Sequence, residues 1–551
     1  MADDTTPVLI VGAGPSGLSS ALFLARHGVS CQLVERHPDL LIHPRARGLT
    51  PRTMEVYRQA GVEPAILAAA YAGPGFAWVP VRARTLNDEY SAPDEPQEDD
   101  GAGASPCSFG PIDQDKLEVV LRDAARRLGA DIRFTSELTS FEHDQNGVTA
   151  TIRDGGTGAE RTVRAGYLIA ADGGASPIRQ RLGIAMDGPG TLFSTITAMI
   201  DADLTPALRG RQATIAYLDR PQPYTILLAH DEEGRRWVFG TGYDAERESP
   251  EDFDDARVAS LVRAAAGLPD VEVRLRPQIP GTEMKVLAFP IRAQLARAYR
   301  AGRVFLVGDA AHSWPPTGGL GANTGIQDAH NLAWKLALVI RGQAGPALLD
   351  TYEQERRPVG AMTMGQAMAR FSTRMGPADA DPILLYSAVA AGYRYRSPAA
   401  PGAGQDDAPL PPTELTGQPG TCAPHVEVTH QGRRISTLDL YGSRFVLLTG
   451  PEGDQVAATA RLSVPVDVYR FGADLQPAAT AAHGIGTSGA LLVRPDGFVA
   501  WRAESGPADS AALPVAMTSI LGHDQERAVG QAGHRPRPDA GLYGGAEVPE
   551  L

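Results

Sequence analysis

The sequence predicts an α/β protein built around a Rossmann-like dinucleotide-binding domain, with an inserted β-sheet and a further α/β unit near the C-terminus. Three features support this class: a strand, glycine turn, helix and second strand at the N-terminus, two later apolar strands ending in Asp-Gly and Gly-Asp, and short alternating strands between them. At 551 residues and 58.2 kDa the chain is too long for one hydrophobic core, so we expect two or three domains.

The first element is the apolar run PVLIV from Pro7, which enters a GxGxxG turn. The first glycine permits the bend, the second lets a pyrophosphate approach, and the third lets the next helix pack on the strand. SSALFLARHG has helical apolar spacing, and CQLVE is a second strand ending in an acid that can accept from ribose hydroxyls. The motif alone leaves FAD and NAD both open. Its predicted contacts are Gly12, Gly14, Pro15, Ser16, Gly17, Glu35 and Arg36.

Two later segments complete a pattern. YLIAADGGASPIRQRLG, from Tyr167, is an apolar strand broken at Asp172-Gly173, and GRVFLVGDAAH, from Gly302, ends in Gly308-Asp309. With the first motif they resemble the three signatures of the class A, single-component FAD-dependent aromatic monooxygenases. Within that class the chain looks most similar to the aromatic polyketide hydroxylases of the anthracycline and angucycline tailoring type. The resemblance implies the aromatic hydroxylase fold and FAD as cofactor.

The resemblance also implies roles around the flavin. Asp309 accepts from the FAD ribose, Pro316 lies beside the isoalloxazine, and backbone N–H groups from Gly321 to Asn323 face its N1 and O2 edge. A helix predicted to begin near Thr324 aims its positive end at the charge of a reduced flavin. The further implied contacts are Arg45, Gln114, Asp172, Gly319 and Ala322, the last standing where family members commonly carry Met.

Several residues have a structural alternative. Asp309 could instead cap a helix at AAHSW, a frequent role for Asp. His312 is expected to be a structural histidine and not a catalytic base. Glu353, Arg356 and Arg357 are expected to fix their helix to the domain through ion pairs.

The substrate region is predicted from alternating apolar and polar stretches such as ATIAYL and YTILLAH, which are typical of a sheet. We expect this sheet to lie across the flavin as a platform. Tyr224, Phe239 and Phe289, together with Phe193, are predicted to line it, and core packing is the alternative for each.

A catalytic residue is predicted from helical spacing. Gln366, Arg370 and Arg374 recur every four residues and so share one helix face. A guanidinium there could lower the pKa of a substrate phenol, and Arg370 is the predicted catalytic residue. A solvated helix face is the alternative.

The domain plan follows from these segments. SAPDEPQEDDGAGASP, from Ser91, predicts a mobile loop, and SPAAPGAGQDDAPLPPTELTGQPG, from Ser397, has the composition of a linker. The C-terminal strands resemble the thioredoxin-like domain of the same hydroxylases, without redox cysteines. The predicted units are an FAD domain (1–78, 111–186 and 291–396), a substrate-binding domain (79–110 and 187–290), a linker (397–420), a thioredoxin-like domain (421–530) and a tail (531–551).

Composition restricts the partners. A net charge of -14 disfavours nucleic acid and anionic membranes, and a small-molecule polycyclic aromatic substrate is expected. The acidic N-terminus and the lack of a long apolar run predict a cytoplasmic protein with no membrane partner. Three cysteines without ligand spacing predict no metal site. We expect a monomer or a homodimer.

The resemblance implies a reaction as well. NADPH or NADH reduces the flavin, O2 then gives a C4a-hydroperoxyflavin, and this species hydroxylates a phenolic ring. The single GxGxxG shows no separate nicotinamide domain. A Baeyer–Villiger or antibiotic-inactivating monooxygenase of the same fold is the enzymatic alternative. A carrier or guanine-nucleotide-dissociation-inhibitor-like protein without flavin turnover is the non-enzymatic one.

Overall fold

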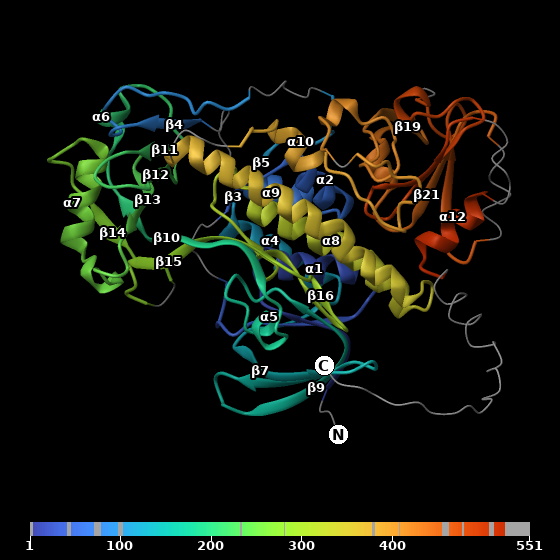
Figure 1. Cartoon of the computed structure of the whole chain (residues 1–551), viewed down its shortest axis with the longest axis horizontal. Helices are drawn as coiled ribbons and strands as arrows, with labels where there is room; N and C mark the ends of the chain where they lie inside the picture. The colour runs from blue at the N-terminus through green and yellow to red at the C-terminus, as the bar shows by residue number, and fades with distance from the viewer. Residues whose placement is uncertain are drawn as a thin grey trace, which may run out of the picture.

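The computed structural model shows a central α/β region, a lobe built on a second sheet, and a C-terminal region on the opposite side of the centre (Figure 1). The tail expected over 531–551, and residues 97–102 of the loop expected to be mobile, lie outside the residues described. The structure describes residues 4–40, 46–70, 79–96, 103–231, 234–279, 282–376, 381–406, 408–453, 462–476, 479–505 and 512–523.

The central sheet has the order β16-β17-β9-β1-β2-β6, and β8 and β7 extend it from β9. β1 (Asp4–Val11) pairs in parallel with β2 (Cys31–Val34) and β9 (Glu160–Ala170), as a Rossmann-like fold requires. The other strands are β6 (Asp131–Arg133), β7 (Ser136–His143), β8 (Val148–Asp154), β16 (Arg300–Ala301) and β17 (Val304–Leu306).

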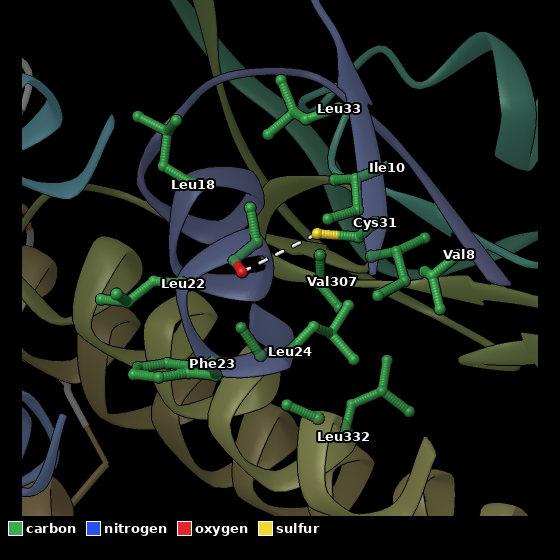
Figure 2. Packing of buried hydrophobic residues seen from close by; sticks show 14 of the residues in the cluster. Val8, Ile10, Leu18, Leu22, Phe23, Leu24, Cys31, Leu33, Val307 and Leu332 are labelled. Carbon is green, nitrogen blue, oxygen red and sulfur yellow. Dashed lines mark hydrogen bonds between the residues drawn. The ribbon is translucent and has the colours of Figure 1, made fainter. Parts of the chain in front are cut away.

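The core of this region lies between the sheet and the helices α1 (Pro15–Arg26) and α8 (Leu320–Ile340). Figure 2 shows Leu18, Leu22 and Leu24 of α1 packed among side chains of β1, β2 and α8. In the same view the Cys31 thiol donates to the carbonyl of Ala21 at 3.8 Å. The burial of α1 explains its helix, because eight of its consecutive residues are removed from water.

The second sheet has the order β18-β15-β10-β13-β12-β11-β4, with β14 beside β10. β4 (Pro80–Ala83) joins it by pairing in parallel with β11 (Ile215–Leu218), which is far away in sequence. α7 (Asp255–Ala266) covers one face, and α9 (Thr351–Met375) runs from this lobe towards the C-terminal region (Figure 1). The other strands are β10 (Met186–Asp201), β12 (Thr225–Ala229), β13 (Arg236–Tyr243), β14 (Arg274–Arg276), β15 (Val286–Ala296) and β18 (His312–Ser313).

The C-terminal region is a mixed four-stranded sheet of order β22-β21-β23-β24. β23 (Ala490–Val493) and β24 (Val499–Ala503) form the hairpin that the Pro495-Asp496-Gly497 stretch predicts, so this hairpin is confirmed. β21 (Phe445–Thr449) and β22 (Val466–Arg470) are parallel, and α12 (Ala512–Ile520) packs on the sheet. The predicted fold class is confirmed by this arrangement of a Rossmann-like domain, an inserted sheet and a C-terminal α/β unit.

Shorter elements connect these regions. The remaining strands are β3 (Arg47–Leu49), β5 (Gly110–Asp113), β19 (Glu427–His430) and β20 (Arg433–Ser436). The remaining helices are α2 (Pro51–Gln59), α3 (Glu63–Ala69), α4 (Gln114–Arg127), α5 (Pro177–Arg181), α6 (Thr205–Leu208) and α10 (Tyr386–Ala391). Single 3-10 turns are η1 (Pro250–Asp252), η2 (Gly308–Ala310), η3 (Pro346–Asp350), η4 (Pro412–Glu414), η5 (Thr437–Leu440) and η6 (Ala481–His483). Within the described ranges, we find no helix that combines the length and the apolar character needed to cross a bilayer.

A buried ionic cluster joins the C-terminal hairpin to α8 and α9. The Arg494 guanidinium donates to both carboxylate oxygens of Glu355, at 2.6 and 2.9 Å. The Lys335 ammonium donates to the same carboxylate at 2.7 Å. Their side chains are fully buried. Burial alone would raise the pKa of Glu355, but Arg494 and Lys335 outweigh it and hold that pKa below its usual 4.5. We call Glu355, Arg494, Lys335 and Asp496 the seam cluster.

Candidate active site

The glycine turn after β1 has the geometry that a dinucleotide needs. Gly12 has φ +106, and a Cβ on Gly17 would lie 1.9 Å from the carbonyl oxygen of Gly12, so both positions are closed by backbone. A Cβ on Gly14 would meet nothing within 4 Å. Gly14 is also the N-cap of α1 and is followed by Pro15 at the first helical position. The open side of the turn therefore presents the start of α1, where a pyrophosphate is stabilised.

The acid at the end of β2 lies against this turn. One oxygen of Glu35 accepts from the backbone N–H of Ala13 at 2.8 Å, and the other accepts from that of His37 at 3.0 Å. The oxygen that accepts from His37 also contacts the His37 ring Nδ1, so the oxygen that accepts from Ala13 is the one with a further lone pair for a ribose hydroxyl. Arg36 is exposed beside it, and Arg45 lies outside the described residues.

The first and third motifs meet at Ser16. A Cβ added to Gly308 or to Gly325 would lie 2.3 Å from the Ser16 hydroxyl oxygen. The start of α1, the η2 turn and α8 therefore touch at a point where only glycine fits. Ser16 lies at the point where these three elements pack against one another.

The second and third motifs are tied together by Arg179. Its guanidinium donates to the carbonyl of Ala310 at 2.8 Å and to that of Gly174 at 3.1 Å. Asp172 accepts from the Ser176 hydroxyl at 2.6 Å and from the Ile178 backbone N–H at 3.2 Å, so it stabilises its own turn. Burial raises the pKa of Asp172, and these hydrogen bonds oppose that shift.

Asp309 is exposed although both of its neighbours, Gly308 and Ala310, are buried. It lies inside the η2 turn, whose N-cap is Val307 with no side-chain cap, so the structure does not support the helix-cap alternative. The exposed Asp309 follows the carboxyl end of β17. This edge of a parallel sheet is where nucleotides bind.

The loop after Asp309 leads into α8, which begins at Leu320 and not near Thr324 as expected. Gly318 and Gly319 have φ of +95 and +64, and this left-handed backbone starts the helix one turn earlier. Pro316 and Gly319 are exposed, and Gly321 and Ala322 are half-buried. The first-turn N–H groups of a 21-residue helix are thus accessible to an acceptor.

Asn323 contributes its side chain as well as its backbone. The Asn323 amide oxygen accepts from the Thr50 backbone N–H at 2.9 Å, and its amide nitrogen donates to the Gly319 carbonyl at 2.9 Å. Gln114, at the start of α4, accepts from the Ala46 backbone N–H at 3.2 Å. Asn323 therefore ties Thr50 to the first turn of α8, and Gln114 ties Ala46 to the start of α4.

A buried carboxylate that the sequence did not single out anchors this loop. Asp328 of α8 contacts His312 Nε2 at 2.8 Å, Arg356 Nε at 2.7 Å and the Gly308 backbone N–H at 3.1 Å. Burial would raise the pKa of Asp328, but Arg356 and His312 outweigh it and lower that pKa. His312 is therefore the structural histidine expected, and Arg356 fixes α9 as expected. The sequence signal that could have marked Asp328 is an acidic residue within the apolar stretch of a predicted helix.

Aromatic side chains gather on the face of the second sheet opposite α7. Phe193 and Tyr224 stack with ring centroids 3.9 Å apart, and Phe371 of α9 lies 5.6 Å from Tyr224. A Cβ on Gly242 would lie 2.9 Å from the Tyr224 ring, so the glycine provides space for it. Phe289 is 38% exposed and pairs with Thr195, which places it on the Phe193 face. We call this the platform face.

Phe239 is not part of that face. It is fully buried. It packs in the core between the sheet and α7, in the same cluster as Ile196. Its neighbour Gly240 has the opposite orientation because side chains alternate along a strand. Among the three predicted lining residues, the structure therefore brings Tyr224 and Phe289 to one face and leaves Phe239 in the core.

Arg370 and Arg374 of α9 are buried, so their face of the helix is not solvated. Arg370 is 1% exposed and Arg374 is 4% exposed. Arg370 donates to the Gln366 side-chain oxygen at 3.0 Å, and Arg374 donates to the Tyr217 hydroxyl at 2.9 Å. A Cβ on Gly318 would lie 3.4 Å from the Arg370 Cδ, so Arg370 adjoins the loop that leads into α8.

These positions fit an FAD molecule. The open Gly14 turn and the start of α1 suit a pyrophosphate, the exposed Asp309 suits a ribose, and the first turn of α8 suits the electron-rich edge of a flavin ring. The platform face has Arg370 beside it, and Arg370 adjoins the loop that leads into α8.

Comparison with known proteins gives the same result. Residues 5–367 match the model of the FAD binding domain family, and residues 416–523 match that of the aromatic-ring hydroxylase C-terminal domain. Tetracenomycin A2 monooxygenase-dioxygenase of Streptomyces glaucescens is 44% identical, over 95% of this chain and 98% of the relative. Aklavinone 12-hydroxylase of Streptomyces purpurascens is 41% identical, over 93% of this chain and 98% of the relative.

Solved structures agree. The crystal structure of aklavinone-11 hydroxylase in a ternary complex with FAD and aklavinone matches with a TM-score of 0.85 and 39% identity, and covers 95% of this chain and all of that one. The flavin-dependent monooxygenase PieE, in complex with FAD and substrate, matches with a TM-score of 0.83 and 32% identity over 95% of this chain and all of that one. The chain therefore belongs to the FAD-dependent aromatic-ring monooxygenases, with aromatic polyketide hydroxylases among its relatives.

Proposed function

We propose that the protein hydroxylates a polycyclic phenolic compound of the aromatic polyketide class, with NADPH or NADH as reductant and O2 as oxidant. The observation that carries this proposal is the position of the platform face, whose stacked Phe193, Tyr224 and Phe371 lie beside Arg370 and the loop that leads into α8. A flat fused ring system gains most from such rings, because aromatic stacking adds to apolar burial.

The residues of this chain divide the work of cofactor binding. The start of α1 and Gly14 bind the pyrophosphate, and Asp309 accepts from the ribose. The first turn of α8 stabilises negative charge on the reduced ring, because the positive end of the helix dipole lies there. When bound, FAD supplies electron transfer from the nicotinamide and oxygen transfer to the substrate.

The platform face positions the substrate. Tyr224 and Phe289 contact its rings, and Arg370 lies where its positive charge favours an ionised hydroxyl group on the substrate. An ionised phenol is more electron-rich and is therefore more easily hydroxylated. The burial of Arg370 strengthens this effect, since a charge acts over a longer range when water is excluded.

The test is turnover by the purified yellow holoprotein with a panel of tetracyclic phenols. NADPH or NADH oxidation should depend on the phenol, and the product should gain one oxygen atom that labelled O2 supplies. An oxygen inserted next to a carbonyl, giving a lactone, would identify a Baeyer–Villiger reaction instead. Two of the proteins named above are aklavinone hydroxylases, which favours ring hydroxylation, and the tetracenomycin A2 relative is a monooxygenase-dioxygenase. Reductant oxidation that no aromatic compound alters would contradict the proposal.

A further inference from the structure

Two buried guanidinium groups share one carboxylate at the C-terminal end of α9. Glu95, in the segment between β4 and β5, lies 2.6 Å from Arg374 Nε through one oxygen and 3.5 Å from Arg370 Nε through the other. Arg370 and Arg374 are almost fully buried, whereas the Glu95 side chain is 20% exposed. The acid therefore closes over the two arginines from the solvent side.

The arginines are held by other contacts besides Glu95. Arg370 also donates to the Gln366 side chain at 3.0 Å and to the Leu384 carbonyl at 2.8 Å. Arg374 also donates to the Tyr217 hydroxyl at 2.9 Å. Because these partners belong to α9, β11 and the chain before α10, the guanidinium groups keep their positions when the Glu95 carboxylate moves.

The same pair lies at the position of the proposed ring substrate. Arg370 adjoins Gly318 of the loop that leads into α8, and Tyr217 is on the platform face, since it pairs with Ile226, which in turn pairs with Gly240. Phe371, between the arginines in sequence, completes the aromatic stack. A ring system on the platform face would thus present its edge to the groups that Glu95 now contacts.

We propose that Glu95 is an internal counter-ion whose place at Arg370 and Arg374 is taken by an acidic oxygen of the substrate. The inference rests on the proposed function and narrows the substrate class to polycyclic compounds that bind as a phenolate or carboxylate. Exchange of one anion for another keeps the buried guanidinium groups paired, which avoids the large cost of an unpaired buried charge. A ring without an ionisable group cannot replace Glu95 and is selected against.

The test compares Glu95→Gln with the wild type, both as oxidised FAD-bound protein. The probes are alizarin, at a pH where it is ionised, and its dimethyl ether, which cannot ionise. Glu95→Gln removes the competing charge but keeps the shape, so alizarin should bind about tenfold more tightly while the ether is unchanged. Glu427→Gln, in an exposed pair with Arg434, is the matched control and should alter neither affinity.

Weaker or unchanged alizarin binding to Glu95→Gln would overturn the proposal, because a purely structural Glu95 would only loosen the site when changed. A second measurement does not need a ring ligand. Crystals of Glu95→Gln soaked in bromide should show an anomalous peak between the two guanidinium groups, and wild-type crystals should not. The absence of an anomalous bromide peak between the two guanidinium groups in Glu95→Gln crystals would also overturn the proposal. Neither measurement reads flavin turnover, so failure here is distinct from failure of the proposed hydroxylation.

Discussion

The two ends of α9 carry the same kind of ion pair in opposite settings. Near its N-terminal end, Glu355 is fully buried and meets Arg494 of the C-terminal hairpin. Near its C-terminal end, Arg370 and Arg374 meet Glu95, which is one-fifth exposed. Figure 1 shows the helix passing from the second-sheet lobe towards the C-terminal region, so one element serves both places.

Burial decides whether a salt bridge can exchange one of its partners. An enclosed pair cannot lose one partner without leaving a charge in a medium that solvates it poorly. A pair that reaches solvent can exchange its carboxylate for another anion at small cost. The seam cluster therefore fixes the position of α9, whereas the Glu95 end is suited to ligand exchange.

The largest effect should come from breaking the seam cluster. Arg494→Met leaves the Glu355 carboxylate buried with its main partner removed, and the free energy of unfolding should fall by about 3 to 5 kcal/mol. Denaturant unfolding of the FAD-bound protein measures it. Arg434→Met, in an exposed pair with Glu427, is the control and should cost less than about 1 kcal/mol. Equal effects of the two variants would erase the distinction between enclosed and open pairs.

A smaller effect is expected on FAD affinity, at a residue that belongs to neither end of α9. Asp309→Ala removes one charge-assisted hydrogen bond of about 1.5 to 3 kcal/mol, so FAD affinity should fall roughly ten- to a hundredfold. Flavin release on dilution, followed by fluorescence, gives the affinity. Asp244→Ala, at an exposed turn, should keep FAD bound. Full flavin retention by Asp309→Ala would show that the exposed carboxylate does not contact the ribose.

The seam cluster should also make stability depend on pH, through Lys335. Burial lowers the pKa of Lys335 from 10.5 to about 8, and Glu355 only partly opposes this. Between these values the unfolded chain holds a proton that the folded protein lacks, so this group makes stability rise by about 1.4 kcal/mol per pH unit. Lys335→Met should remove that contribution, seen as the difference between variant and wild-type unfolding curves over the range. Lys285→Met, in a partly exposed pair with Asp255, should leave the slope as it is; a Lys335→Met curve parallel to wild type would contradict the assignment.

The predictable parts of the molecule are those whose cause is local. The roles of Gly12, Gly14 and Gly17 follow from neighbouring residues, since a turn and the next helix decide which glycine is closed by backbone and which stays open. The exposed position of Asp309 at the end of β17 follows in the same way. Strand alternation likewise reveals the platform sheet.

The parts that could not be predicted depend on contacts between residues far apart in sequence, or on which face of a strand is buried. Glu95 meets Arg374 across 279 residues, and nothing in its acidic segment marks that partner. Phe239 shows the limit of alternation, because a period of two locates a strand without saying which face is the core. The early start of α8 depended on the left-handed backbone of Gly318 and Gly319, which helical apolar spacing does not reveal.

The bond between Glu355 and Arg494 also sets an order of events during synthesis. Arg494 leaves the ribosome 139 residues after Glu355, which at about 5 to 20 residues per second is a delay of roughly 7 to 28 seconds. During that time the nascent flavin-binding half exposes Trp334 and Leu348, which pack in the finished protein with Phe445 and Leu492 of the C-terminal sheet. The β23–β24 hairpin can therefore contact α8 and α9 only after both helices have been synthesised.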